Sequence, residues 1–178
     1  MSNIGNLSKV QKLTLAGILV ALGVVLSPLS IPIGAARVFP AQHALNVIGG
    51  VVLGPAYAVV MAFATSVLRN LLGTGTLLAF PGSMFGALLA GLTYKYMKEK
   101  LSLACVGELI GTGVLGALVA FPVAALVMGR EVATFAFVIP FVMSSLAGGM
   151  IAFVLLGAFV RIGVFPFGRT RKPSNGNS

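Results

Sequence analysis

Acidic residues are almost absent from this chain of 178 residues, which has three Asp and Glu in total against twelve Lys and Arg. Charged residues of both signs make up 8% of the chain, whereas a soluble globular domain carries roughly 25%. Hydrophobic residues make up 58%, which excludes intrinsic disorder because a disordered chain needs low hydrophobicity. The composition therefore excludes an ordinary soluble fold and predicts an integral membrane protein.

Cysteine, tryptophan and histidine are scarce as well. Cys105 is the single cysteine, inside an apolar run, and tryptophan is absent, so a disulfide scaffold and a cysteine-based metal cluster are excluded. His43 is the single histidine and has no carboxylate at ligand spacing, so we expect no metal site. The sequence also lacks the glycine-rich loop ending in Lys-Ser or Lys-Thr that cradles ATP phosphates. We expect neither a metal nor another cofactor.

Long apolar runs predict six membrane-spanning helices in a single membrane domain, residues 1–178. A spanning helix needs about 20 mostly apolar residues, and the short connections leave no room for a soluble module. The predicted spans are residues 13–29, 44–53, 56–72, 81–97, 103–128 and 137–162. The expected fold class is an all-α integral membrane protein, a bundle of six transmembrane helices.

Two of these spans have alternative interpretations. The second run is short and meets the third at Gly54-Pro55; because proline suits the first turn of a helix, a tight bend is favoured over one long kinked helix. The first run can be read as a signal peptide, since Lys9 and Lys12 precede it and Ala35-Ala36 resembles a cleavage site. That site lies well past the apolar run and five more apolar segments follow, so a membrane span is favoured.

The basic residues predict the orientation, because cytoplasmic loops carry an excess of Lys and Arg. With six spans, nine basic residues fall on one side: Lys9, Lys12, Lys95, Lys98, Lys100, Arg161, Arg169, Arg171 and Lys172. The other, outer side has Arg37, Arg69 and Arg130. We therefore expect a multi-pass cell-membrane protein with both termini in the cytoplasm and a basic tail at residues 163–178. The tail is short and has no interleaved aromatics in its basic cluster, so nucleic acid is not an expected partner.

Polar side chains gather near the outer ends of the predicted helices, where a binding site can form. They are Arg37, Gln42, His43, Asn46, Arg69, Asn70, Thr74, Thr76, Ser83, Arg130 and Glu131. The first outer loop, residues 27–43, contains three prolines, so we expect it to be ordered but not helical throughout. It can cover the outer end of the bundle; the alternative is a connector anchored among the lipid headgroups.

Five of these polar residues are candidates for a site. His43 and Asn46 are three residues apart and share a face on a helix, which points either into a pocket or, in the alternative, toward headgroups and free helix N–H groups. Asn70 and Ser83 flank the predicted start of the fourth helix, whose free N–H groups and positive dipole can hold a small polar ligand. The alternative is an interfacial anchor for Arg69 and a helix C-cap for Asn70.

Glu108 is the one acidic residue inside a predicted span. A carboxyl group buried there must be paired or protonated, and a functional role is the default hypothesis. Two roles stay open, a structural partner for a basic or hydroxyl group and a direct ligand contact.

Gly17 and Ala21 form a pair of small residues four positions apart in the first predicted span. Small residues let helices approach closely. The pair therefore marks a docking face for a partner helix or, in the alternative, packing within the bundle.

Several segments resemble the substrate-binding S components of energy-coupling factor (ECF) transporters, and within them the ThiW group, which is linked to the thiazole precursor of thiamine. The likeness covers about residues 10–160, and its most specific part is residues 68–87, which include the run RNLLGTGTLLAFPGS. The other segments that carry it are residues 38–43, 46–47, 53–55 and 107–113.

The resemblance implies a six-helix bundle that captures a small vitamin-related molecule from outside, in a pocket covered by the first loop. It implies as partners a shared ECF transmembrane subunit and two ABC ATPase subunits, which supply the ATPase that this chain lacks. The bound S component would then topple in the membrane to release its substrate inward. Family members dock through small residues of the first helix, here Gly17 and Ala21; S components usually carry alanine at both places, so Gly17 is a departure.

The ligand implied by the resemblance is hydroxyethylthiazole, a neutral molecule whose polar groups are a ring nitrogen and a hydroxyl. A small pocket with apolar walls and a few hydrogen-bonding groups suits such a molecule. From polarity and position, the candidate wall residues are Phe39, Phe80 and Tyr57. The candidate polar contacts are His43, Asn46, Asn70 and Ser83, with Arg69 and Glu108 as further candidates.

Two other classes of function stay open. A self-sufficient secondary transporter or channel would use buried charges for ion coupling, and Glu108 alone gives it thin support. An intramembrane serine hydrolase would pair Ser83 with His43, but the sequence around Ser83 is not the Gly-x-Ser-x-Gly elbow of such enzymes. We therefore expect a transport component of the membrane and not an enzyme.

Overall fold

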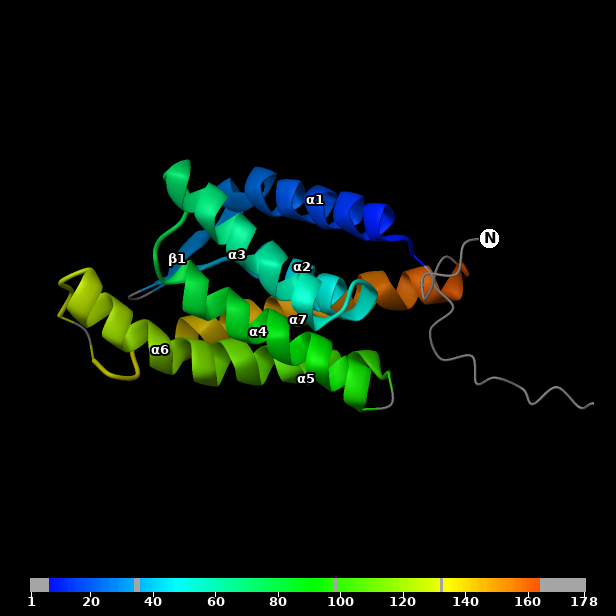
Figure 1. Cartoon of the computed structure of the whole chain (residues 1–178). Coiled ribbons are helices and arrows are strands. Elements are labelled where there is room, and N and C mark those ends of the chain that lie inside the picture. Colours follow the sequence, from blue (N-terminus) through cyan, green and yellow to red (C-terminus); the bar gives the residue numbers. More distant parts are fainter. Residues whose placement is uncertain (1–6, 34–35, 98, 132, 164–178) are drawn as a thin grey trace, which may run out of the picture.

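The computed structural model describes residues 7–33, 36–97, 99–131 and 133–163, and shows a mostly helical chain whose helices run side by side (Figure 1). The separate long helices are α1 (Lys9–Val25), α2 (Pro40–Val52), α3 (Pro55–Leu71), α4 (Ala79–Tyr96) and α7 (Val138–Arg161). One continuous helical rod lies between α4 and α7 in the chain: α5 (Leu101–Ile110), η3 (Gly111–Gly116), α6 (Ala117–Pro122) and η4 (Val123–Val127). Beyond Gly163, the predicted basic tail lies outside the described residues.

Each predicted apolar run is helical, with boundaries that local chemistry shifts. α2 begins four residues earlier than predicted, because Pro40 occupies its first turn, where a missing N–H costs nothing. α1 ends at Val25 and is followed by the short 3₁₀ turn η2 (Ser27–Leu29), which contains Pro28. The predicted tight bend is confirmed: Gly54 has a φ of 91°, a conformation that favours glycine, and the next residue starts α3.

The fifth predicted run is helical from Leu101 to Val127 but not α-helical throughout. Its segments η3 and η4 are π-helical, a wider turn that occurs in short stretches and often near functional sites. Within η3, Gly111 lies so close to α4 that a Cβ there would come within 2.7 Å of the Phe85 carbonyl carbon. Glycine at this position therefore allows the rod to pack tightly along α4.

The loop between α1 and α2 corrects the expectation of a purely helical chain. It contains a small antiparallel hairpin, β1 (Ile31–Ile33) and β2 (Ala36–Val38), in which Ile31 pairs with Val38. Ala36 and Val38 are buried and Arg37 is exposed. The loop is thus not helical throughout, as predicted, and one face of the hairpin packs against the bundle.

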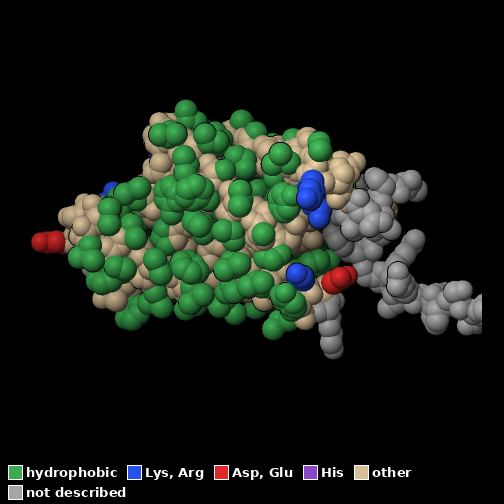
Figure 2. Space-filling model, in the orientation of Figure 1, with side chains coloured by type: hydrophobic (Ala, Val, Ile, Leu, Met, Phe, Trp, Pro, Cys, Tyr) green, Lys and Arg blue, Asp and Glu red, His purple; other side chains and the backbone are tan. Residues whose placement is uncertain are grey.

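The surface that the bundle presents to its surroundings is apolar. Hydrophobic side chains cover most of the face seen in Figure 2, and the charged side chains visible there lie toward the two ends. Two helical segments, Leu101–Val127 and Val138–Arg161, are long and apolar enough to cross a membrane. Such broad exposed apolar surface is unfavourable in water, so this surface suits lipid.

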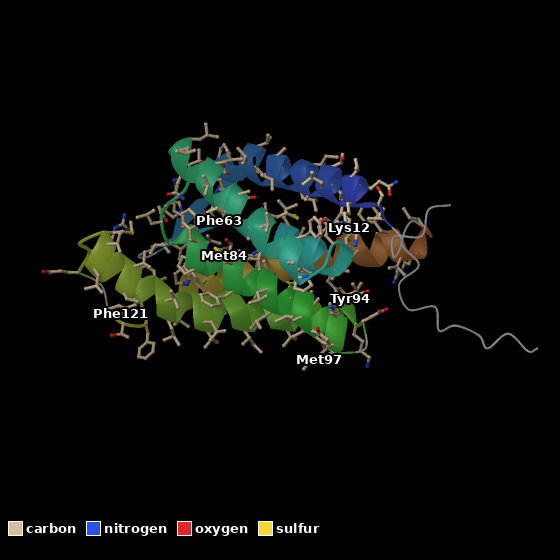
Figure 3. All side chains as sticks on the ribbon, in the orientation of Figure 1. Lys12, Phe63, Met84, Tyr94, Met97 and Phe121 are labelled. Carbon is tan, nitrogen blue, oxygen red and sulfur yellow. The ribbon has the colours of Figure 1, made fainter. Side chains whose placement is uncertain are left out.

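Two apolar clusters flank a polar layer in the interior, and a third, smaller one contains Ala58, Ala62 and Ala87. One contains Val47, Tyr94 and Leu156, and the other contains Phe137 and Phe141 with Phe121 packed against it; Figure 3 places Tyr94 and Phe121 toward opposite ends of the bundle. Both the rod and α7 pass from one cluster to the other. The buried polar side chains on these two elements, which include Glu108 and Ser144, lie between the clusters along the chain.

Candidate functional site

A cavity lies beneath the hairpin, at the end of the bundle where α2, α4 and α7 begin and α3 ends. Its free volume is about 50 Å³, which is room for a few water molecules. The lining residues are Ala36, Arg37, Phe39, Gln42, His43, Arg69, Thr74, Gly75, Thr76, Leu78, Ala79, Gly82, Ser83, Phe141 and Ser144. The cavity therefore suits a small molecule with several polar groups.

Arg69, in the last turn of α3, brings a guanidinium group to this cavity while its side chain is only 4% exposed. Nη1 donates to Oε1 of Gln42 at 3.1 Å, and Nη2 lies 3.5 Å from the Thr74 carbonyl oxygen. The guanidinium carbon stacks over the Phe39 ring, 4.1 Å from its centroid. Within the described part of the chain, the buried Nε has no hydrogen-bond partner.

His43 faces the cavity from α2, and a second polar cluster holds its ring from behind. Nδ1 lies 2.6 Å from Oε1 of Glu108, which is fully buried on α5. Thr112 donates to the same carboxylate oxygen at 2.8 Å, and Ser145 donates to the other oxygen. Because all three neighbours can donate, Glu108 serves as an acceptor through both oxygens and fixes the orientation of the imidazole.

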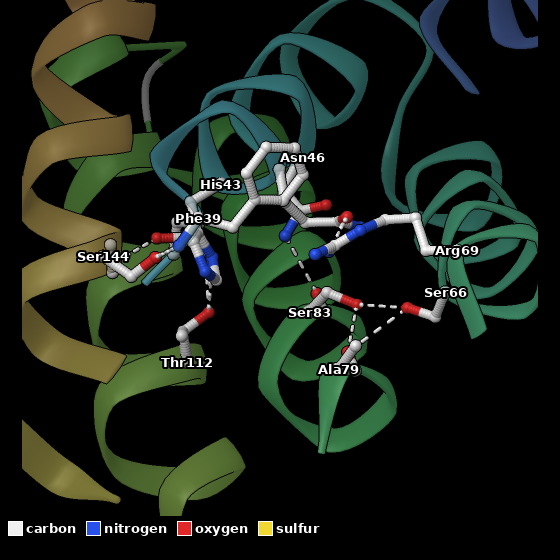
Figure 4. A network of polar contacts seen from close by, with 12 residues as sticks. Phe39, His43, Asn46, Ser66, Arg69, Ala79, Ser83, Thr112 and Ser144 are labelled. Carbon is white, nitrogen blue, oxygen red and sulfur yellow. Dashed lines mark hydrogen bonds and ion pairs between the residues drawn. The ribbon is translucent and has the colours of Figure 1, made fainter. Parts of the chain in front are cut away.

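Ser83 is held in place on α4 by bonds from two sides. Its hydroxyl donates to the Ala79 carbonyl at 2.7 Å and lies 3.2 Å from the Ser66 hydroxyl of α3. The Asn46 side chain donates to the backbone carbonyl of Ser83 at 3.1 Å. Figure 4 shows this network beside Arg69, with His43 and Thr112 on the other side of Phe39.

The segment between α3 and α4 forms one wall of the cavity, and Asn70 ties it down. The Asn70 amide donates to the carbonyl of Ser66 at 2.8 Å and to that of Thr76 at 3.0 Å. Thr74 and Gly75 both donate their backbone N–H groups to the Arg69 carbonyl at 2.9 Å. Asn70 therefore positions the wall but is not itself among the lining residues.

The structure brings four of the residues predicted from sequence to the cavity wall: Phe39, His43, Arg69 and Ser83. Asn46 and Glu108 do not line the cavity but hold residues that do, through the bonds to Ser83 and His43.

Two predicted wall residues lie elsewhere. The Phe80 ring packs against the ring of Phe63, at 5.6 Å between centroids, and Phe63 is half exposed on the outer surface. Tyr57, near the start of α3, packs against the cluster that contains Val47 and Leu156. Neither is among the residues that line the cavity.

Other residues of the site were not among the sequence candidates. Phe141 and Ser144 line the cavity from α7, and the Ser144 hydroxyl accepts a hydrogen bond from the Phe39 N–H at 2.8 Å. Thr112 joins the His43 cluster. A signal for Thr112 existed, because it follows Glu108 by four positions and so lies on the same helix face.

Among the described residues, the cavity has neither a cluster of metal ligands nor a serine hydrogen-bonded to a base. The described residues contain no group of three or more His, Cys, Asp or Glu able to hold a metal ion. A serine nucleophile is normally hydrogen-bonded to its base. Here the Ser83 hydroxyl bonds Ala79 and Ser66, while Nδ1 of His43 is bonded to Glu108.

Residues 13–162 match the model of a family described as thiamine-precursor transporter protein (ThiW). No curated protein and no solved structure matches the chain. The matched range contains every residue of the cavity wall. Together with the apolar surface and the two long apolar helices, this match identifies a membrane protein, and the chain belongs to the ThiW family of thiamine-precursor transporters.

Proposed function

We propose that this ThiW-family protein is the substrate-binding S component of an ECF-type ABC importer. It captures a thiamine precursor, with hydroxyethylthiazole as the expected ligand, for ATP-driven uptake. The observation that carries the proposal is the small polar cavity under the hairpin, lined by His43, Arg69 and Ser83 and walled by Phe39. A ring nitrogen and a hydroxyl can bond these side chains while the heterocycle packs on the phenyl ring.

The proposed topology is a multi-pass bundle of six helices in the cell membrane, with both termini in the cytoplasm. The start of α1 and the end of α7 lie at the same end of the bundle in Figure 1, and the hairpin lies toward the other end. Lys9 and Lys12 at the start of α1 and Arg161 at the end of α7 agree with a cytoplasmic position under the positive-inside rule. The cavity then opens to the outside.

Direct ligand contacts are proposed for Phe39, His43, Arg69 and Ser83. Indirect roles are proposed for Asn46, Asn70 and Glu108. These side chains do not line the cavity, but their hydrogen bonds hold the residues and the segment that do. Phe80 and Tyr57 are left out of the proposed site, since they lie away from the cavity.

Gly17 and Ala21 are proposed as the docking face for the ECF transmembrane subunit, which joins two ABC ATPase subunits. Both residues are exposed on α1, and a Cβ built on Gly17 meets nothing within 4 Å. The bundle itself thus leaves this face free.

The docking face is tested with a Gly17→Leu variant, which should abolish uptake while the purified protein still binds the ligand. Gly157→Leu is the matched control, because Gly157 is a helical glycine of α7 whose added Cβ also meets nothing within 4 Å. Loss of ligand binding in the Gly17 variant would place this face in the packing of the bundle and contradict the docking role.

Uptake of radiolabelled hydroxyethylthiazole separates the proposal from a self-sufficient secondary transporter. The observation that favours this second candidate is the buried hydrogen-bonded pair of His43 and Glu108, a type of group that can couple transport to protons. Cells that express the protein with the ECF subunits should accumulate the label, and cells without these subunits should not. Undiminished uptake without them would contradict the S-component role and support the secondary transporter.

A further inference from the structure

We infer that the cavity is built to hold an oxyanion, a carboxylate or phosphate group on the ligand, at the guanidinium of Arg69. This assignment deepens the proposed function, on which it rests for the heterocyclic part of the ligand. The neutral alcohol hydroxyethylthiazole is then the weaker ligand of the site, and a thiazole that carries an acidic group is the stronger one.

The positive charge of Arg69 is buried without a counter-charge. The guanidinium of arginine stays protonated in proteins, and the Arg69 side chain is 4% exposed. The groups around it are an amide oxygen of Gln42, a carbonyl oxygen of Thr74 and the ring face of Phe39. All three are neutral, and a buried charge without an opposite charge is unfavourable.

No acidic side chain of the protein is available to pair with Arg69. Its three acidic residues are Glu99, Glu108 and Glu131. Glu99 and Glu131 are exposed, and Glu108 is bonded to His43, Thr112 and Ser145. Among the described residues, the ion pair joins His43 to Glu108, and no acidic side chain forms one with Arg69. A counter-charge for Arg69 therefore has to come from the ligand.

The Arg69 guanidinium also has N–H donors that remain for a ligand. A guanidinium has five N–H donors in a planar fork, and it binds carboxylates and phosphates through two parallel hydrogen bonds. Gln42 occupies Nη1, Nη2 has only the 3.5 Å contact with Thr74, and the buried Nε has no partner among the described residues. Nε and Nη2 share one edge of the guanidinium, which is the edge used for paired bonding to an oxyanion.

The rim of the cavity is positively charged as well. Arg37 also lines the cavity, from the exposed face of β2. Two arginines at one cavity with no acidic lining residue attract anions and repel cations. Figure 4 shows the Arg69 side chain extending from α3 toward the space between Phe39 and Ser83, where the ligand would lie.

The test is a binding series on the purified full-length protein in detergent or nanodiscs, measured by calorimetry. The probes are hydroxyethylthiazole, its phosphate ester, 4-methylthiazole-5-carboxylate and inorganic phosphate. We expect one or both thiazole anions to bind about tenfold or more tightly than the alcohol, because charge-assisted bonds are roughly twice as strong as neutral ones. Comparison of the affinities for the phosphate ester and for the carboxylate shows which oxyanion the site prefers.

Arg69→Met is the decisive variant, with Arg69→Lys as its companion if the methionine variant fails to fold. The methionine variant should lose the preference for anions, and its ligand-free form should unfold at a higher temperature than the wild type because an unpaired buried charge is gone. The lysine variant keeps the positive charge but not the planar, forked set of N–H donors, and it should lose most of the preference for anions. Arg37→Met, at the exposed rim, should have a smaller effect.

The outcomes separate this inference from the proposed function. Wild-type protein that binds the alcohol as tightly as the anions overturns the inference and leaves the thiazole site standing. Binding of inorganic phosphate, lost in Arg69→Met, without binding of any thiazole, supports the oxyanion site and contradicts the thiamine-precursor ligand. An Arg69→Met protein with the wild-type preference for anions overturns the assignment to Arg69.

Discussion

His43 and Glu108 meet inside the bundle, with Nδ1 and Oε1 2.6 Å apart across 65 positions of sequence. This contact joins α2 to α5, and Thr112 and Ser145 extend it to η3 and α7. The imidazole of His43 therefore has a buried hydrogen-bonded cluster on one side and the cavity on the other. The pair links the stability of the bundle to the position of a side chain in the site.

Glu108→Ala should destabilise the protein strongly. The change leaves His43, Thr112 and Ser145 without their buried acceptor, and breaking a buried pair costs about 3–5 kcal/mol. The thermal unfolding midpoint in detergent should fall, and ligand affinity should fall with it because the imidazole is no longer held. Glu99→Ala is the control, since Glu99 is exposed. Equal midpoints for the two variants would show that the cluster does not hold the bundle together.

Gly148→Ala should separate α2 from α7. A Cβ at this position would lie 2.6 Å from Cβ of His43 and 2.8 Å from the Ala44 nitrogen, so one of the helices has to move. Overpacking of this kind costs typically 1–3 kcal/mol, and the unfolding midpoint should drop. Gly157→Ala in the same helix meets nothing within 4 Å and should leave the midpoint unchanged or raise it. A Gly148→Ala variant with the unfolding midpoint of the wild type would contradict the close approach of α2 and α7.

Asn70→Ala should weaken ligand binding while the protein stays folded. Its amide donates to the carbonyls of Ser66 and Thr76, and each lost bond costs about 0.5–1.5 kcal/mol. The freed segment carries Thr74 and Gly75, which line the cavity. Calorimetry on the purified variant measures the affinity, and its circular dichroism spectrum checks the fold. Unchanged affinity would mean that this wall makes no contribution to binding.

Most of the fold could be predicted from hydrophobicity alone. The six apolar runs mark the helical segments, and Gly54-Pro55 marks the bend, because these signals are local. The helix starts were harder: Pro40 begins α2 before the apolar run does. The two strands of the hairpin, Ile31–Ile33 and Ala36–Val38, have three residues each, which is too short for an alternating apolar pattern to predict a strand.

The site was predicted in part. His43, Arg69 and Ser83 stood out because polar residues are rare in this chain, and all three line the cavity. Phe80 and Tyr57 were chosen by residue type alone, and aromatic side chains serve equally well in the core or against lipid. Phe141 and Ser144 come from α7, which begins more than fifty positions after Ser83, the last of the other lining residues. Only tertiary packing brings them to the cavity.

Equilibrium binding of radiolabelled hydroxyethylthiazole and its phosphate ester to the purified protein decides whether the cavity binds a thiamine precursor. The wild type should bind at least one of them saturably with one site per chain. His43→Ala, at the cavity wall, should lower the affinity about tenfold or more, as expected for the loss of a buried polar contact. Tyr57→Phe, away from the cavity, should bind like the wild type. Absence of saturable binding to the wild type, or equal affinities for the wild type and His43→Ala, would contradict the account.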